Sequence, residues 1–121
     1  MTTVLAIGAG GALGSVLRYL LGRLVQGGAH VGFPIGTLTV NILGCVIVGA
    51  LSRYFLNNEI HPVLKSALIV GFCGGFTTFS AFSLETVGLL TGGAVGRAML
   101  YVAASVLLCL AGTAVGFFAV R

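Results

Sequence analysis

With 121 residues, of which 58% are hydrophobic and 7% charged, the chain is too poor in charge to be a soluble domain, which carries roughly 25% charged residues. Its formal net charge of +4 comes from six Lys or Arg residues against two acidic ones, and the basic residues are dispersed, which excludes a nucleic-acid-binding surface. The surface must therefore face lipid, and because one membrane-crossing helix takes about 20 apolar residues, the length allows four or at most five crossings and no extramembrane domain.

Four hydrophobic runs predict four transmembrane helices in a single all-α domain spanning residues 1–121, at about 4–25, 34–56, 63–90 and 95–120. We expect the first run to remain as a helix rather than to be cleaved as a signal peptide, because no basic residue precedes it. A glycine-rich loop over residues 26–32 separates it from the second run, and Pro34 suits a helix start.

Small residues predict that these helices pack closely. Lipid gives helices no hydrophobic reason to associate, so association depends on small residues that let backbones approach. Twenty glycines are present, and two pairs with four-residue spacing place glycines on one helix face: Gly10 with Gly14, and Gly112 with Gly116. The three cysteines lie singly in apolar runs and match no disulfide framework or metal site, so we expect packing residues at Cys45, Cys73 and Cys109.

The basic residues are nearly balanced across the membrane. Four crossings place both termini and the loop between the second and third helices on one side. That side carries Arg53, Lys65 and Arg121, and the other carries Arg23 and Arg97, with Arg18 about a turn inside the first helix. Because the positive-inside rule orients a protein by such a difference, we expect both orientations and hypothesise that two copies pair antiparallel about an axis in the membrane plane.

The third predicted helix carries the strongest functional signal. Gly74-Gly75, followed by hydroxylated β-branched residues, is expected to break this helix at mid-membrane. Broken helices are tolerated there only where the freed backbone groups line a cavity or bind an ion. An aromatic stripe recurs every third residue and ends in a carboxylate, at Phe76, Phe79, Phe82 and Glu85. The interleaved hydroxyls need partners and indicate a polar environment: Thr77, Thr78, Ser80 and Ser83.

Polar residues on the second and fourth helices extend this environment. The Asn41 amide offers two donors and an acceptor, although a single interhelical hydrogen bond would also explain it. On the fourth helix a track of three hydroxyls and a thiol recurs at intervals of four, at Tyr101, Ser105, Cys109 and Thr113. A helical hydroxyl can bond back to its own backbone, but four in register opposite Asn41 and the broken helix favour a polar path.

The chemistry of this path favours a small anion. Its lining is rich in donors, namely the amide, the hydroxyls and the positive edges of phenylalanine rings. Arg18 raises the local anion concentration near one mouth. Glu85 is the one acidic residue within a span, too few for a multi-carboxylate cation site. The sequence contains no pattern typical of a nucleophile–base pair, a metal cluster or a phosphate-binding loop, so permeation is favoured over catalysis and we expect no enzyme.

Three segments resemble the Fluc (CrcB) family of fluoride channels. Residues 10–19 (GGALGSVLRY) resemble its GGxxGxxxRY/W opening, and residues 36–44 (GTLTVNILG) resemble its GTLxVNxxG motif. Residues 71–85 (GFCGGFTTFSAFSLE) resemble its GxxGGxTTFSTFSxE signature, which is the most specific of the three. Ala81 replaces the commoner Thr, and Cys109 stands where the family often has Ser. The resemblance covers all four spans in order.

The resemblance implies a dual-topology antiparallel homodimer with two fluoride pores, in the plasma (inner) membrane of a bacterium. Passive exit of cytoplasmic fluoride through these pores would protect the cell from fluoride toxicity. The resemblance also implies that the ring edges of Phe79 and Phe82 and the amide of Asn41 contact fluoride in the pore. Further pore groups are implied at Thr78, Ser80, Glu85, Ser105 and Thr113. It also implies a vestibule arginine at Arg18 and a structural sodium ion at the dimer axis, held by backbone carbonyls of Gly74 and Thr77.

Two other classes of membrane protein compete with this prediction. A small multidrug transporter also has four short helices and dual topology, but its mechanism needs a carboxylate in the first helix, where this chain has none. A structural subunit or assembly factor would use Asn41 and the Thr/Phe cluster for packing alone. Fluoride efflux from liposomes separates all three classes.

Overall fold

The computed structural model describes residues 1–28 and 32–121, so residues 29–31 of the predicted loop lie outside the described part. Its elements are α1 (Thr2–Gly27), α2 (Ile35–Asn57), α3 (Pro62–Ser66), the π-helix η1 (Ala67–Cys73), α4 (Gly74–Phe76), α5 (Phe79–Thr91) and α6 (Val95–Ala119). α3, η1 and α4 follow one another without a gap, and together with α5 they form one apolar segment, Pro62–Thr91. This segment and the helices α1, α2 and α6 are each long and apolar enough to cross a membrane.

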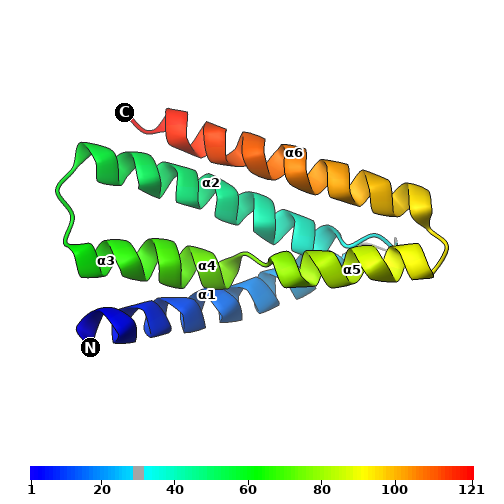
Figure 1. The fold of residues 1–121 in the computed structure, drawn as a ribbon, viewed down its shortest axis with the longest axis horizontal. Helices are drawn as coiled ribbons and strands as arrows, with labels where there is room; N and C mark the ends of the chain where they lie inside the picture. Colours follow the sequence, from blue (N-terminus) through cyan, green and yellow to red (C-terminus); the bar gives the residue numbers. More distant parts are fainter. Residues whose placement is uncertain (29–31) are drawn as a thin grey trace.

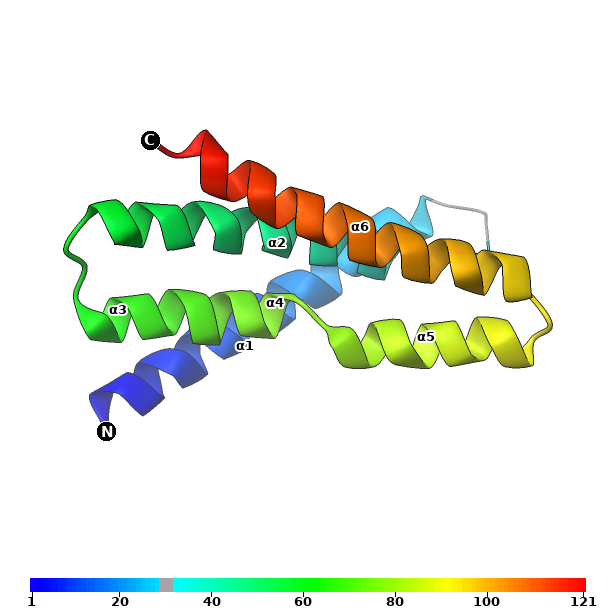
Figure 2. The same ribbon diagram turned by 45° about the horizontal axis from the view of Figure 1, so that its top comes forward.

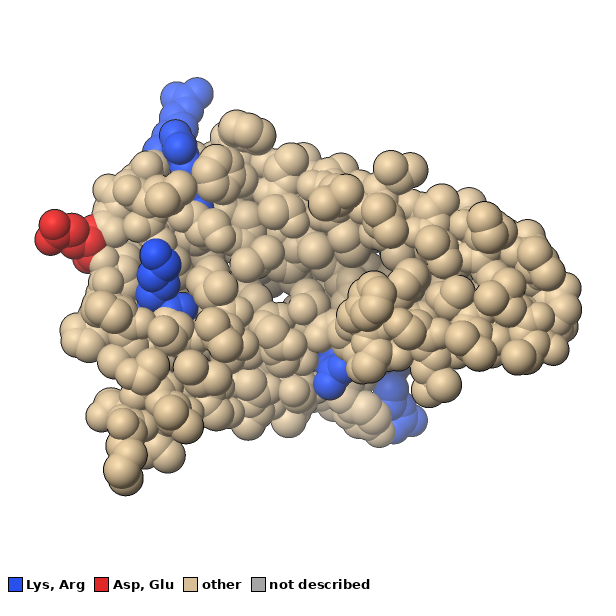
Figure 3. All heavy atoms as spheres, viewed as in Figure 1, with Lys and Arg blue, Asp and Glu red and all other residues tan. Residues whose placement is uncertain are grey.

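The helices lie side by side along the long axis of the molecule (Figure 1). Both termini and the α2–α3 connection lie at one end, and the connection between α5 and α6 lies at the other. α2 and α6 therefore run in the same direction, and the turned view shows α6 crossing α2 at a shallow angle (Figure 2). Uncharged atoms cover nearly the whole face seen in Figure 3, as expected for a surface in contact with lipid.

Glycines form the contact between α2 and α6. A Cβ atom at Gly116 of α6 would overlap the Val46 carbonyl oxygen, and one at Gly49 of α2 would overlap the Thr113 carbonyl oxygen. A Cβ at Gly112 would lie 3.3 Å from the Ile42 carbonyl oxygen. Backbones this close gain dispersion energy along the whole contact, which is the main attraction between helices in lipid.

A second glycine contact joins α1 to the π-helix and α4. Cβ atoms at Gly10 and Gly14 of α1 would overlap the carbonyl oxygens of Ala67 and Phe72, and one at Gly75 would overlap that of Gly11. Both glycine pairs singled out in the sequence therefore lie at helix–helix contacts. The π-helix over Ala67–Cys73 lies against α1 here, and single π-helical turns inside α-helices often occur at functional sites.

The third helix is broken, but not at the predicted position. Gly74-Gly75 are helical, and the chain becomes extended at Thr77 (φ −91°, ψ 158°) and Thr78 (φ −150°, ψ 114°). The prediction of a break at the glycines is wrong because Gly75 packs against the backbone of Gly11. This contact stabilises the helix at a residue type whose own helix propensity is low. The break follows this contact directly, at the two threonines.

Candidate functional site

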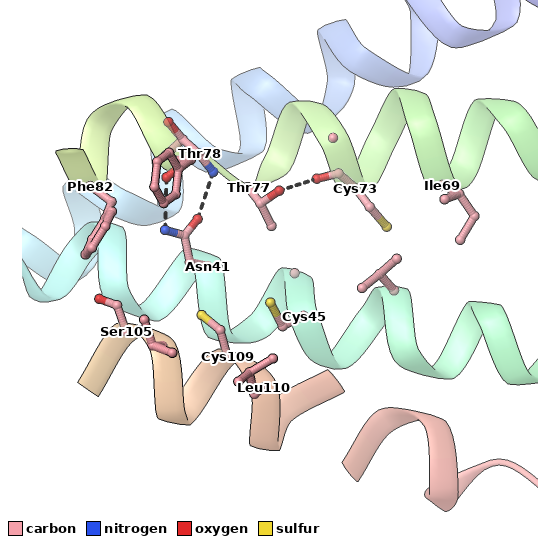
Figure 4. A pocket seen from close by; sticks show the side chains of 15 residues that line it. Asn41, Cys45, Ile69, Cys73, Thr77, Thr78, Phe82, Ser105, Cys109 and Leu110 are labelled. Atoms are coloured by element: carbon pink, nitrogen blue, oxygen red, sulfur yellow. Dashed lines mark hydrogen bonds between the residues drawn. The ribbon is translucent and has the colours of Figure 1, made fainter. Parts of the chain in front are cut away.

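A groove of about 520 Å³ lies between α2, the broken third helix and α6 (Figure 4). It brings together side chains or backbone groups that are far apart in the sequence. Seven of the predicted site residues line it: Asn41, Gly74, Thr77, Thr78, Phe79, Phe82 and Ser105. The groove lies beside the break in the third helix, so the interrupted backbone forms part of its wall.

Asn41 holds the broken backbone in place. It is the seventh residue of α2, and its Nδ2 donates to the Thr78 carbonyl oxygen at 3.1 Å while its Oδ1 accepts from the Thr78 N–H at 2.8 Å. These two bonds replace the helical partners that an extended residue loses, and unpaired backbone groups in lipid are costly. A carboxamide carries a second N–H, and no group in residues 1–28 or 32–121 accepts it.

Thr78 starts the helix that follows the break. Its Oγ1 accepts a hydrogen bond from the Ala81 N–H at 3.1 Å, the usual arrangement of a threonine N-cap. The same oxygen lies 3.2 Å from Ser80 Oγ. Ser80 itself is exposed and does not line the groove. The hydroxyls of these two residues therefore organise the start of α5.

Aromatic rings form one side of the groove. The Phe79 and Phe82 centroids are 5.3 Å apart with the planes tilted by 44°, and Phe82 lies 5.2 Å from the ring of Tyr101. Tyr101 is fully buried, whereas Phe79 is 79% exposed. The positive ring edges can face an anion, and Phe79 is left uncovered by its own chain.

On α6 only part of the predicted track of polar residues lines the groove. Ser105 lines the groove, is 8% exposed, and its Oγ has no hydrogen-bond partner in the described part of the chain. Thr113 does not line the groove, and its hydroxyl donates to the carbonyl oxygen of Cys109 in its own helix at 3.1 Å. Ser105 is thus the buried donor that is free for a solute, because an unpaired buried hydroxyl is unfavourable without one.

A second groove, of about 330 Å³, lies on the other side of Thr78, which lines both. Arg18 and Glu85 line it. Both Glu85 oxygens accept hydroxyl donors, Oε1 from Thr37 at 2.6 Å and Oε2 from Tyr101 at 2.7 Å. Sequence reasoning missed Thr37, although it lies one turn before Asn41 on α2.

The carbonyl oxygens of Gly74 and Thr77 fit a cation site. In the described residues neither is given a hydrogen bond: the Thr78 N–H, which would reach the Gly74 carbonyl in a continuous helix, donates to Asn41 Oδ1, and the Ala81 N–H, which would reach the Thr77 carbonyl, donates to Thr78 Oγ1. Space is open beside Gly74, where a Cβ atom would meet nothing within 4 Å. Carbonyls at a half-helix C-terminus carry the negative end of the helix dipole and coordinate Na⁺ in other membrane proteins.

Four apolar segments, three of which enclose a groove that holds the Asn41 amide and the Ser105 hydroxyl, define a multi-pass helical membrane protein with polar groups beside its broken third helix. Comparison with known proteins gives its family. The model of the family described as "CrcB-like protein, Camphor Resistance (CrcB)" matches residues 5–117. The chain therefore belongs to the CrcB family.

Individual relatives align with this chain over nearly its whole length. A protein of Thermus thermophilus is 49% identical over 108 residues, which cover 89% of this chain and 86% of the relative. One of Geobacter sulfurreducens is 48% identical over 122 residues, 100% of this chain and 98% of the relative. One of a Sulfurovum species is 44% identical over 113 residues, 93% and 89% respectively. Each of the three is named "Fluoride-specific ion channel FluC".

Proposed function

We propose that this chain is a fluoride channel that lets cytoplasmic fluoride leave a bacterium passively through its inner membrane. The observation that carries the proposal is the unpartnered, buried Ser105 hydroxyl in a groove with the Asn41 amide and two phenylalanine rings. The names of the related proteins support the choice of fluoride among small anions. The chain is a channel subunit and not an enzyme.

The groove has the chemistry that fluoride needs. Fluoride is small and strongly hydrated, so a pore must replace its water with closely placed donors, as selectivity filters do for other ions. The Asn41 N–H, the Ser105 O–H and the edges of the Phe79 and Phe82 rings supply such donors. Among the residues that the structure describes, no Lys or Arg lines this groove. Conduction needs binding that is weak enough for exit, and neutral donors meet this need better than a fixed cation.

The second groove is assigned to one mouth of the path. Arg18 there attracts anions from the aqueous side. Glu85 in the same groove is held by the Thr37 and Tyr101 hydroxyls, which stabilise a carboxylate in a region where an unsatisfied one would be costly. Thr78 lines both grooves, so it stands between the mouth and the Phe-lined section. Ser80 meets this path only through the Thr78 hydroxyl, and Thr113 lies one turn beyond Cys109 on α6.

A second copy in the opposite orientation completes the site. One chain encloses its groove from three helices and leaves Phe79, one of the lining rings, 79% exposed, and a partner that covers this ring would close the pore. The near balance of basic residues between the two ends removes a preference for one orientation. An antiparallel homodimer has twofold symmetry, so it contains two equivalent pores.

A sodium ion is the structural cofactor we assign to the dimer axis. The Gly74 and Thr77 carbonyls of one chain offer two oxygens, and an antiparallel partner would double that number. The ion would satisfy backbone groups that the break leaves without hydrogen bonds. Its role is to hold the two broken helices together, and it takes no part in permeation.

Fluoride efflux from liposomes that contain the purified protein tests the function, with a fluoride electrode as the readout. Wild-type protein should release trapped fluoride when a potassium ionophore balances the charge. Phe82→Ile should slow release by about two- to tenfold, if a ring-edge contact with the anion is worth about as much as one between two aromatic rings, about 0.5–1.5 kcal/mol, while size-exclusion chromatography shows an unchanged dimer. Phe118→Ile is the matched control, since Phe118 lies on α6, is 80% exposed and does not line the groove.

The rival classes give different results in the same assay. A small multidrug transporter would move an organic cation against protons and release no fluoride. A structural subunit would release nothing. Folded, reconstituted wild-type protein without fluoride efflux would overturn the proposal, and a wild-type rate in Phe82→Ile would remove that ring from the conduction path.

A further inference from the structure

The fold brings the three cysteines to one groove. Cys45 from α2, Cys73 from the π-helix and Cys109 from α6 all line the 520 Å³ cavity, and all three are free thiols. The sequence placed each singly in an apolar run, which predicts simple packing. Because they come from three different helices, only the tertiary structure shows that they share one cavity with the Asn41 amide and the Ser105 hydroxyl.

Two of these thiols come from helices that are in direct contact. α2 and α6 approach each other at Gly112, where a Cβ atom would lie 3.7 Å from the Cβ of Cys45. Cys109 lies one turn earlier in α6, and its side chain points towards the N-terminal end of its helix, as helical side chains do. The thiols of Cys45 and Cys109 both line the groove, one from each of these two helices. Figure 4 shows these two side chains on adjacent turns of α2 and α6, with Cys73 on the opposite side of the groove.

Two thiols without further ligands select one class of metal ion. Zinc takes four ligands in a closed site, and in residues 1–28 and 32–121 no three His, Cys, Asp or Glu side chains are grouped to hold a metal. Thiolates prefer soft cations, and soft ions such as Hg²⁺, Ag⁺ and Cu⁺ are stable with two sulfur ligands in a linear arrangement. A thiol pair on facing helices matches that coordination.

We propose that Cys45 and Cys109 form a binding site for a soft, two-coordinate metal cation, and that an ion bound there blocks the groove. Each thiol loses its proton to water and forms one sulfur–metal bond, so one Hg²⁺ releases two protons and nothing is oxidised. Cys45 is one turn from Asn41 on α2, and Cys109 is one turn from Ser105 on α6. A metal ion between the sulfurs therefore lies beside the donors that fluoride would use. The blocking step rests on the proposed channel function, whereas binding does not.

Thiol protection tests binding without any measurement of flux. Purified protein in detergent is treated with one equivalent of mercuric chloride, unfolded, and alkylated with N-ethylmaleimide, and mass spectrometry then locates the alkylated cysteines. Cys45 and Cys109 should be protected together while Cys73 is alkylated. Cys45→Ala and Cys109→Ser should each abolish the joint protection, and Cys73→Ala should preserve it. Protection of Cys73, or of one cysteine alone, would overturn the site.

Fluoride efflux tests the block. Micromolar mercuric chloride should slow wild-type and Cys73→Ala channels by at least about tenfold, and Cys45→Ala and Cys109→Ser by less than about twofold, each relative to its own untreated rate. Zinc chloride should slow none of them. Joint protection of both thiols with undiminished efflux would overturn the block. Absence of efflux from every untreated protein would instead overturn the channel function, and the protection experiment would still decide the metal site.

Discussion

At the scale of single residues, Asn41 has two tasks that are usually separate. Its side chain makes two hydrogen bonds to the backbone of Thr78, so it stabilises the break in the third helix. It also lines the groove with an N–H left over. In the proposed channel the same amide shapes the wall of the groove and supplies one of its donors.

Replacement of Asn41 by Leu should reduce both stability and flux. Leucine leaves the Thr78 N–H and carbonyl without partners, and each unpaired buried group costs about 1–3 kcal/mol. Thermal unfolding followed by circular dichroism in detergent should show a clear loss of stability, and fluoride efflux should disappear. Asn58→Leu is the matched control, because the Asn58 amide donates to the Tyr54 carbonyl at the exposed end of α2. Equal losses of stability in the two variants would contradict the bridging role of Asn41.

The amide and hydroxyl groups that line the groove could be predicted from the sequence, and the polar contacts that were missed have a common cause. Asn41, Ser105 and the Thr77-Thr78 pair are polar groups inside apolar runs, which is itself a signal in lipid. Thr37 gives no such signal, because a threonine in a helix usually bonds to its own backbone. Its actual partner, Glu85, is 48 residues away. The neighbouring thiols of Cys45 and Cys109 were hidden for the same reason.

At the scale of the elements, glycine contacts fix how the helices meet. α2 and α6 touch through Gly49, Gly112 and Gly116, and α1 touches the third helix through Gly10, Gly14 and Gly75. The four-residue spacing of glycines predicted two of these faces. The position of the break was not predictable in this way, because glycine weakens an isolated helix whereas packing against α1 stabilises the helix at Gly75. The π-helix has no sequence signal that we can identify.

The α2–α6 contact can be tested by adding one methyl group. Gly116→Ala places a Cβ atom against the Val46 carbonyl oxygen and 3.0 Å from the Ala50 nitrogen, so the two backbones must separate. We expect a loss of about 1–3 kcal/mol from overpacking, seen as a lower midpoint of thermal unfolding in detergent. Gly96→Ala, on the same helix with nothing within 4 Å, should be neutral or slightly stabilising, because alanine favours helix. A similar midpoint for both variants would mean that α2 and α6 do not meet at Gly116.

At the scale of the whole molecule, the near balance of basic residues between the two ends becomes part of the proposed mechanism. The chain offers an open groove, two carbonyl oxygens without hydrogen-bond partners in the described residues and an uncovered phenylalanine ring. A copy in the same orientation would not bring these groups together around an axis in the membrane plane. In the proposed dimer, the balanced distribution of basic residues would let one gene supply both orientations. Function would then depend on a small number of surface charges far from the groove.

Charge substitutions at the two ends should therefore control activity. Lys65→Gln with Arg121→Gln removes two exposed basic residues from the end that holds both termini, and Arg23→Gln with Arg97→Gln removes two from the other end. By the positive-inside rule each double variant should insert mainly in one orientation, opposite to that of the other. In a fluoride-sensitive bacterium each double variant alone should fail to restore growth on fluoride, whereas their co-expression should restore it.

The orientation of each variant can be checked with two C-terminal reporters, one active only in the cytoplasm and one active only in the periplasm. Both reporters should give a signal on the wild type, and only one of them should give a signal on each double variant. Full growth from either double variant alone, with one reporter silent, would overturn the antiparallel dimer, because a single orientation would then suffice for a working channel.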